Sequence, residues 1–470
     1  MSTFSGLNTA LSGLNAARTG LNTTGQNLTN VNTPGYTRQR TEFASLGAPA
    51  RGALNDLAGI KPGQGVGVTG ITRMGDAFLD ARVRTSFSAA GYTSTRANAL
   101  NQVEETLNEP STNGLAAQLQ GFWSAWGGVS NDPGEAASSA VLLEKSGTLL
   151  QGIAAGYTAL DNQWSQTRNQ ANTVVQDINN TAAQVAGLNK QIRTANASGM
   201  PSNELVDQRN TLTARIAQLA GGTTRDLPDG SNEILLGGNV LVSGSTSNQL
   251  KLSPEPRKMA DVGTNTLQVQ WAHRPDSAVD LEGGQLSGLV SVLGSGGVIA
   301  QTAESYNALA TKLAETVNKV HQGGATPDGT TNLDFFKVDA GVPAALGISV
   351  IPKNASGIAS GTPGNGGKDG SIADKISLLG SGPGSPDSLW SDTVVRLGVE
   401  IKNGRQQAVL ADISLTNAVS NQQSNASVDL DEENVNLLAF QHAYQASARV
   451  MTAIDEALDV LINQTGRVGR

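Results

Sequence analysis

The two ends of the chain carry apolar residues at intervals of seven positions. At the N-terminal end the repeat consists of leucines, and beyond residue 429 two such rows run three residues apart. A sustained spacing of seven is typical of a helix that buries one narrow face against another helix. We therefore predict a helix at each end and expect the two to pair with each other and with neighbouring copies. The predicted seam residues are Leu7, Leu14, Leu21 and Leu28, together with Leu437, Phe440, Tyr444, Met451, Ile454, Leu458 and Leu461.

A turn closes the predicted N-terminal helix, which spans residues 3–31. The helix contains four glycines, and each lowers helix stability by about 0.5–1 kcal/mol relative to alanine. We therefore expect both ends to be disordered in the free chain and to fold on assembly. Pro34 keeps the residue before it out of the helical conformation, and Pro-Gly suits the centre of a type II turn. The predicted turn motif is Asn32, Pro34, Gly35 and Tyr36.

Helical periodicity also dominates the interior of the chain. A helix over residues 163–197 ends at the Gly-Met-Pro of 199–201, and Ser202 or Asn203 can cap a return helix. The seven-residue rows of these two helices indicate a rod-like antiparallel pair. Asp429 resembles the first residue of a capping box. The other predicted helices span residues 76–107, 113–128, 134–160, 285–322, 391–425 and 429–464.

Two segments show patterns typical of β structure. Residues 66–71 alternate between apolar and small or polar positions, which indicates a short strand or hairpin. Residues 221–282 contain short apolar runs around a hairpin signal at 237–239, followed by the alternating LQVQW. We predict a small β domain in this second segment. Residues 352–390 are rich in Gly, Ser, Pro and Asn and are predicted to form a surface loop.

Together these elements predict a mainly α fold with a small β domain. The terminal helices would pair as a coiled coil, while the central helices would form a long rod. The predicted boundaries are 1–45 with 428–470 for the terminal helices, 46–221 with 285–427 for the rod, including a loop insertion at about 326–390, and 222–284 for the β domain.

Composition narrows the kinds of partner. A chain of 470 residues is too long for a single core. Its formal net charge is −8 and it has no dense run of basic residues, so nucleic acid is not expected as a partner. The chain has no cysteine, which excludes disulfides and thiolate metal sites. No membrane partner is expected either, because neither an apolar run of about eighteen residues nor a signal-peptide pattern is present.

The charges of the two ends are also complementary. Residues 1–45 contain three arginines and one glutamate, whereas residues 428–470 contain seven acidic residues and three arginines. Opposite signs favour a mixed pair of ends over two like ends. The effect per exposed pair is small, about 0–1 kcal/mol.

No pattern of residues indicates a cofactor or a metal ion. Gly65-x-Gly67-x-x-Gly70 fits a dinucleotide-binding fingerprint, but Pro62 precedes it and no crossover unit follows, so a tight hairpin is favoured. The three histidines lack the spacing of metal ligands or of a catalytic triad. Residues 328–334 lack the closing glutamate of a calcium-binding loop, so a turn is favoured there.

Two further clusters are interpreted as structural. Glu204, Asp207 and Arg209 are expected on the exposed side of the return helix, as a solvated face with local salt bridges rather than a catalytic group. Trp123 and Trp126, three residues apart, are expected in the core. We therefore predict that the chain is not an enzyme.

Both ends resemble the ends of bacterial flagellar axial proteins. The segments concerned are GLNAARTGLNTTGQNLTNVNTPGYTR (residues 13–38) and NLLAFQHAYQASARVMTAIDEALDVLIN (residues 436–463). Three further segments are similar to the FlgK family of hook-associated proteins, the first junction proteins between hook and filament. They are GQGVGVTGITRMGDAFLDARVR (63–84), NELVDQRNTLTARI (203–216) and SVDLDEENVNLLAFQHAYQ (427–445).

This resemblance implies a structural role in the flagellum. The protein would assemble with itself into a short tube on the hook protein, followed by the second junction protein FlgL and then flagellin, and its rod would resemble the helical bundle of flagellin. It would leave the cell unfolded through the flagellar type III apparatus, kept soluble by a FlgN-type chaperone on the C-terminal helix. Its location would then be secreted and extracellular. The lack of cysteine and the weak N-terminal helix suit passage through a narrow channel.

Two alternatives are open at this point. The chain could be the hook protein or another axial protein, although the hook protein is mainly β between its ends and lacks a helical pair like that of residues 163–220. A secreted adhesin with a helical stalk is the alternative from another class. Such an adhesin should show repeats or an aromatic-rich ligand face, and neither is visible in the sequence.

Overall fold

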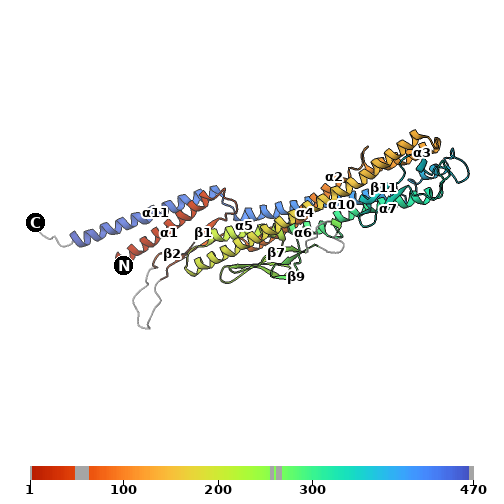
Figure 1. Ribbon diagram of the computed structural model, residues 1–470. Coiled ribbons are helices and arrows are strands. Elements are labelled where there is room, and N and C mark those ends of the chain that lie inside the picture. The colour runs from red at the N-terminus through yellow and green to blue at the C-terminus, as the bar shows by residue number, and fades with distance from the viewer. Residues whose placement is uncertain (1–2, 48–62, 254–258, 261–266, 465–470) are drawn as a thin grey trace.

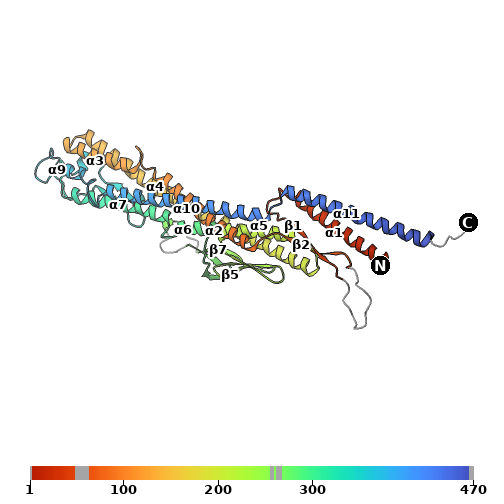
Figure 2. The same ribbon diagram turned by 180° about the vertical axis from the view of Figure 1, so that it is seen from behind.

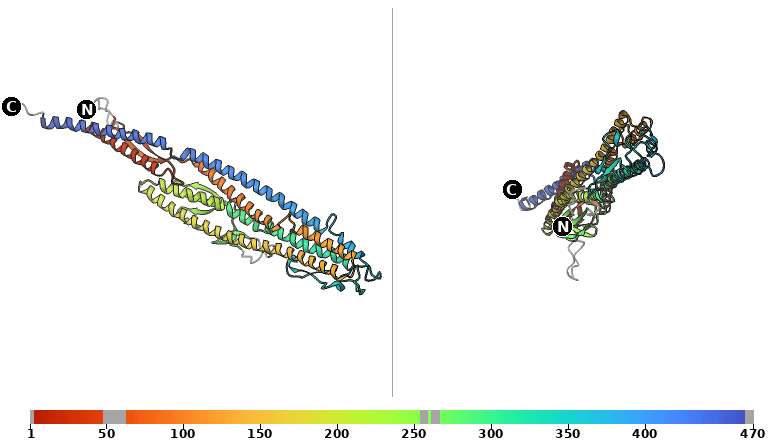
Figure 3. Two further views of the ribbon diagram at one scale, coloured as in Figure 1. Left: turned by 90° about the horizontal axis from the view of Figure 1, so that it is seen from above. Right: turned by 45° about the vertical axis from the view of Figure 1, so that its right-hand side comes forward.

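The chain folds into an elongated molecule whose long helices run nearly parallel to its axis (Figure 1). The computed structural model describes residues 3–47, 63–253, 259–260 and 267–464. The first and last helices extend together from one end of a helical rod, as the view from behind also shows (Figure 2). Seen from above, this terminal pair extends the long axis of the rod (Figure 3).

The N-terminal segment comprises α1 (Thr3–Thr29) and an antiparallel hairpin of β1 (Gln39–Ser45) and β2 (Val66–Arg73). The predicted helix and the predicted strand at 66–71 are both confirmed. The partner strand β1 was not predicted. It pairs with β2 from Gln39 opposite Arg73 onward, with a bulge between Glu42 and Phe43.

The rod begins with α2 (Ala77–Leu107), α3 (Leu115–Asn131), α4 (Ala136–Ala197) and α5 (Asn203–Ala220). The predicted separation between helices at 134–160 and 163–197 is wrong, because α4 is continuous over 62 residues. Its buried row passes through the predicted break, with Leu160 and Trp164 both in the core. The predicted return helix is confirmed as α5, and Gly199 at φ +66° supplies the turn before it.

Helices α6 (Gly284–Leu293) and α7 (Val298–His321) form the middle of the rod. They were predicted as one helix over 285–322, which is wrong because the chain turns tightly at the glycines between them. A Cβ on Gly297 would lie 2.3 Å from the carbonyl oxygen of Val292. Length and composition alone would also suit a membrane span here, but 56% of the most apolar window is buried inside the protein.

Two small sheets lie beside α4. One consists of β3 (Thr223–Asp226), β4 (Asn232–Leu236), β5 (Asn239–Ser243) and β6 (Thr246–Ser247), and the other of β7 (Leu250–Ser253), β8 (Gln268–Trp271) and β9 (Arg274–Ala278). The predicted hairpin at 237–239 is confirmed, with Gly237 and Gly238 both at positive φ between β4 and β5. Asparagines of α4 hold both sheets: Asn189 donates to the Asn232 carbonyl at 2.9 Å, and Asn179 donates to the Leu250 carbonyl at 3.0 Å.

The segment between α7 and the next long helix is folded. It contains β10 (Phe336–Val338), α8 (Ala344–Gly347), β11 (Ile348–Val350), the 3-10 turn η2 (Ala355–Gly357) and α9 (Ser371–Ser377). The prediction of a surface loop over 352–390 is therefore wrong in part. Ile372 and Ile376 enter the same core as Trp126, so few apolar residues among many small polar ones are enough to fix this segment.

His321 belongs to this core and is fully buried. Its Nδ1 lies 2.7 Å from the Leu333 carbonyl oxygen, and its Nε2 accepts a hydrogen bond from the Ala359 amide at 2.9 Å. Burial lowers the pKa of His321, so the ring is neutral and Nδ1 is the donor. Trp123 and Trp126 lie in the core as predicted.

Two long helices complete the chain, α10 (Pro386–Ala426) and α11 (Leu430–Asp459), and α11 continues into a short π-helical turn at Val460–Gln464. Helix α10 packs along α2, and α11 packs along α1. The predicted cap of the last helix is confirmed, since the Asp429 carboxylate accepts from the amides of Asp431 at 2.8 Å and Glu432 at 3.2 Å.

Candidate functional site: the terminal helix pair and its polar joint

Helices α1 and α11 form an antiparallel pair with very close contacts, which we call the terminal helix pair. Glycines at intervals of seven on α1 face residues at intervals of seven on α11. A Cβ on Gly6 would lie 3.2 Å from Ile454 Cδ1, and one on Gly13 would lie 2.9 Å from Ser447 Oγ. On Gly20 a Cβ would lie 2.6 Å from the Phe440 ring. The helices can approach this closely only because these positions lack side chains.

The face of α1 that contains these glycines is made of small residues. Ala10 and Ala17 are buried and alternate with the glycines at steps of four and three, the spacing of a coiled-coil seam. Thr24 and Asn27 continue the same face to the base of the helix, where both are buried. From the sequence alone, these glycines were interpreted only as residues that weaken the helix. Their seven-residue spacing was the signal that could have revealed the contact face.

The predicted seam residues lie mostly at the edges of this contact. Leu7, Leu14, Leu21 and Leu28 are half-buried within the single chain rather than enclosed. On α11, Tyr444 is 37% exposed and Leu461 is 53% exposed. The remaining predicted residues on that helix are half-buried: Leu437, Phe440, Met451, Ile454 and Leu458. Their enclosure between copies stays a prediction.

Much of the apolar surface of α11 faces away from α1. Val435, Leu438 and Val450 are each more than half exposed. Among the described residues of α11, only Glu433 is buried. An extended exposed apolar surface of this kind is typical of a protein–protein interface.

A group of hydrogen-bonded side chains joins the terminal helix pair to the rod, and we call it the polar joint. At its centre the Asn27 side chain is buried and fully bonded. Its Nδ2 donates to the Gln39 carbonyl at 2.8 Å and to Glu433 at 3.1 Å, and its Oδ1 accepts from the Gln39 amide and the Tyr36 hydroxyl, both at 2.9 Å. The polar joint consists of Asn27, Tyr36, Arg38, Gln39, Arg73, Asp80, Asp207 and Glu433.

Arg38 carries the electrostatic attraction that was predicted between the two ends. Its Nε donates to Glu433 at 2.8 Å, and its Nη1 lies 2.6 Å from Glu432 at the start of α11. Burial favours a lower pKa for Arg38, but the bonds to Glu432 and Glu433 outweigh it and raise the pKa. Because the Glu433 carboxylate is only 2% exposed, this pair is shielded from salt more than a surface pair would be.

Asp207 ties the joint to the rod. Its carboxylate accepts from the Thr37 amide at 3.0 Å and from Arg73 Nε, while Arg73 also lies 3.6 Å from Asp80 of α2. The prediction that Asp207 and Arg209 lie on an exposed face is wrong, because both are buried, and Arg209 donates to the Gly230 carbonyl at 2.7 Å. Their partners are distant in sequence, so helical periodicity could not reveal them.

The turn after α1 closes against α5. The Tyr36 amide donates to the Thr33 carbonyl at 3.1 Å, and Gly35 has φ +81°, the geometry that Pro-Gly favours. A Cβ on Gly35 would lie 2.5 Å from Thr211 Oγ1. Burial, followed by the carboxylates of Glu204, Asp207 and Glu433, raises the pKa of Tyr36 far above its usual range. The phenol therefore stays protonated and remains a donor to Asn27.

The described residues contain no group of three or more histidine or acidic side chains that could hold a metal ion. The polar side chains of the joint bond one another and the backbone, so the arrangement suits mechanical connection.

Two glycine substitutions on α1 separate close packing from helix propensity. Gly20→Ala should lower the free energy of local opening of α1 and α11 by about 1–3 kcal/mol, because the added methyl group overpacks the Phe440 contact. Gly25→Ala is the matched control, since nothing lies within 4 Å of its added Cβ. It should raise the same free energy by about 0.5–1 kcal/mol. Amide hydrogen exchange of both helices measures this, and equal effects of the two changes would contradict the contact.

Comparisons with known protein families match three stretches of the chain to flagellar proteins. Residues 100–336 match the family described as the flagellar hook-associated protein FlgK helical domain. Residues 7–37 match the flagella basal body rod protein family, and residues 420–464 match the C-terminal part of the flagellar basal body rod FlgEFG proteins. The terminal matches fall on α1 and α11.

Comparisons with whole proteins agree with these family matches. The chain is 30% identical to flagellar hook-associated protein 1 of Bacillus subtilis, with 100% of both chains covered. It is 29% identical to the Escherichia coli protein of that name over 72% of this chain and 61% of the relative. The solved structure of the flagellar hook junction protein FlgK from Burkholderia pseudomallei superposes with a TM-score of 0.65 at 15% identity, covering 73% of this chain and 100% of that one. At this identity the superposition supports the fold alone.

Proposed function

The chain belongs to the FlgK family of flagellar hook-associated proteins, structural proteins of the junction between hook and filament, and we propose that its terminal helix pair builds the wall of a tube there. The tube would consist of many copies of this chain. The observation that carries the proposal is the close pairing of α1 with α11 through the row Gly6, Gly13 and Gly20. It makes one compact building block from two ends more than 390 residues apart.

The match of α1 and α11 to families of basal body rod proteins supports separate roles for the terminal helices and the rod. Those families share the terminal segments, whereas the match over residues 100–336 is to the FlgK helical domain. We propose that residues 1–45 and 428–470 form the inner tube and that residues 46–221 with 285–427 form the rod outside it. Residues 222–284 would form a small outer β domain beside the rod.

The leucine row of α1 is the proposed seam between copies. Leu7, Leu14, Leu21 and Leu28 lie next to the glycine row and keep part of their surface open in the single chain. Neighbouring copies would cover these leucines together with the exposed apolar residues of α11. Burial of this apolar surface would then stabilise the tube by about 25 cal/mol for each Å² removed from water.

Membership in the family supports a proposal for the assembly order and the export route. As a flagellar protein the chain assembles with other flagellar components, and we propose the hook protein below it and FlgL above it. Export through the type III apparatus and a FlgN-type chaperone on α11 would place it outside the cell. The exposed Val435, Leu438 and Val450 give such a chaperone an apolar face to cover before export. We also infer that the chain is not an enzyme, because its family is structural.

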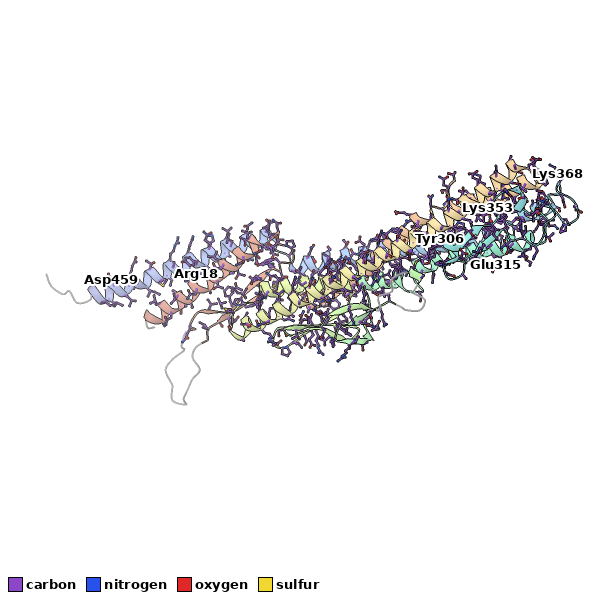
Figure 4. The ribbon with its side chains drawn as sticks, in the orientation of Figure 1. Arg18, Tyr306, Glu315, Lys353, Lys368 and Asp459 are labelled. Carbon is purple, nitrogen blue, oxygen red and sulfur yellow. The ribbon has the colours of Figure 1, made fainter. Side chains whose placement is uncertain are left out.

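The proposed location can be tested by labelling the far end of the rod. The chain has no cysteine, so Lys353→Cys creates one exposed thiol near that end (Figure 4). Flagella that carry this variant should bind maleimide-gold in one narrow band at the distal end of the hook. Gold along the filament, or none on intact flagella that contain the protein, would contradict the proposed location.

A further inference from the structure

Helix α10 carries a row of exposed apolar residues, which we call the apolar stripe. Its members follow one another at steps of three and four, the spacing of a single helical face. On the other side of the helix, Trp390, Leu397 and Ile401 are buried in the rod. The stripe is about 27 Å long at 1.5 Å per residue, and such a surface is typical of a contact with another protein. It consists of Val395, Val399, Val409, Leu410 and Ile413, each more than half exposed, with Lys402 and Gln406 between them.

The exposed face of α4 lacks charge over a long stretch. In residues 146–174, all of which the structure describes, every exposed residue is Gln, Asn, Thr or Ala, and the charged Asp161 and Arg168 are half-buried. Helix α7, by contrast, exposes Glu315 and Lys319. Charged residues are depleted at the centre of protein interfaces, because an unpaired charge is costly to bury. We call these exposed positions of α4 the uncharged face: Thr148, Gln151, Ala155, Thr158, Asn162, Gln166, Asn169, Gln170 and Thr173.

The apolar stripe and the uncharged face lie at the same height on opposite edges of the rod. Both helices run toward the polar joint, and the view from above shows α10 along one edge and α4 along the other (Figure 3). Gln163 of α4 donates to the Ala99 carbonyl of α2 at 3.0 Å. On α10, a Cβ at Gly404 would lie 2.7 Å from Cδ1 of Leu100, the next residue of α2. Residues 395–413 of α10 are therefore level with the uncharged face.

We propose that the apolar stripe of α10 in one copy packs against the uncharged face of α4 in the next copy around the tube. The inference rests on the proposed tube, in which neighbouring rods stand side by side. Two unlike faces on opposite edges of one subunit make a heterologous contact, which repeats from copy to copy until it closes a ring or builds a helix. The uncharged face suits the stripe because no charge loses its water there, and Lys402 can lay its methylene groups along the contact with its ammonium in water. The rods would then form a continuous layer outside the inner tube.

Cross-linking between two introduced cysteines tests which faces meet. The chain has no cysteine, so Gln406→Cys with Gln166→Cys places one thiol in the apolar stripe and one on the uncharged face. In purified flagella a short bis-maleimide linker should join neighbouring copies into a ladder of dimers, trimers and larger species on a denaturing gel. Either cysteine alone should give no ladder, because like faces do not meet. Gln406→Cys with Thr311→Cys, on the exposed surface of α7, is the matched control and should stay monomeric.

Two results of this experiment would overturn the docking. A ladder from one cysteine alone would show that like faces meet. The other is a paired variant that stays monomeric in flagella that contain the protein. The Lys353→Cys labelling reads the proposed location separately, so a gold band at the hook without a ladder would contradict the docking alone.

Leu410→Glu tests whether the apolar stripe is covered in the flagellum. Leu410 is 60% exposed in the single chain, so the thermal unfolding of the free chain should be unchanged. A charge enclosed between copies without a partner is costly, so the amount incorporated relative to the amount exported should fall by about tenfold or more. Thr311→Glu adds the same charge on α7 and should leave incorporation unchanged. Equal incorporation of the two variants would show that the stripe stays open to water, and a loss of export alone would assign it to a partner inside the cell. Either result would overturn the docking.

Discussion

Cells that lack this chain should carry intact hooks without filaments and should release filament protein into the medium. In the proposed order, filament subunits add only to a surface built by the junction proteins. Without the terminal helix pairs of this chain, the hook end offers no matching surface, so exported filament subunits diffuse away. Electron microscopy of the cells and gel analysis of the medium measure both effects.

The control for this experiment is a plasmid copy of the gene, which should restore attached filaments and clear the medium. Deletion cells that still grow attached filaments would show that the chain is dispensable at the junction. Its structural role would then have to be sought elsewhere in the flagellum.

The double substitution Leu14→Ala with Leu21→Ala should abolish incorporation into flagella and leave the thermal unfolding of the rod nearly unchanged. Each leucine is half-buried in the single chain and would become enclosed only between copies. Truncating an enclosed leucine costs about 2–5 kcal/mol through lost transfer free energy and a cavity, and less where the seam is partly closed. The same loss recurs in every copy of the tube.

Comparing this double substitution with Leu11→Ala separates a seam from a general effect on α1. Leu11 is on the same helix, is 45% exposed and lies outside the seven-residue row, so its truncation should leave incorporation unchanged. Circular dichroism of the free chain reports the unfolding of the rod. Parallel loss of the rod's melting temperature and of assembly would assign Leu14 and Leu21 to an ordinary folded core. Normal assembly of the double variant would contradict the proposed leucine seam.

Local periodicity predicted most of the long helices because their partners lie along one face of a regular helix. The rows of α1, α5 and α11 and the hairpin of β4 and β5 follow from spacing that a single sequence displays. The breaks were less predictable. Helix α4 continues where a boundary was expected because Trp164 and Leu160 share one core, whereas α6 ends early because Gly297 permits a turn that no other residue would.

In the candidate site too, local patterns could be predicted from the sequence, whereas contacts with distant residues could not. The apolar rows and the Pro34-Gly35 turn could be recognised from the sequence, but the glycine row was interpreted as weakness, since only the partner helix shows what fills the space. Asp207 was assigned to solvent because its partners, Arg73 and Thr37, are more than 130 residues away. Burial of a charge is decided by such distant partners.

A single disulfide tests the central claim that α1 and α11 of one chain pair in the assembled flagellum. In Gly13→Cys with Ser447→Cys the two Cβ atoms would be 3.8 Å apart, which suits a disulfide, and the chain has no other cysteine. Gly25→Cys with Ser447→Cys is the control, because nothing lies within 4 Å of a Cβ at residue 25. Mild oxidation of purified flagella should convert the first variant, but not the control, into cross-linked single chains that migrate faster on a non-reducing gel. Absence of the cross-link, or cross-links only between two chains, would contradict the pairing on which the account depends.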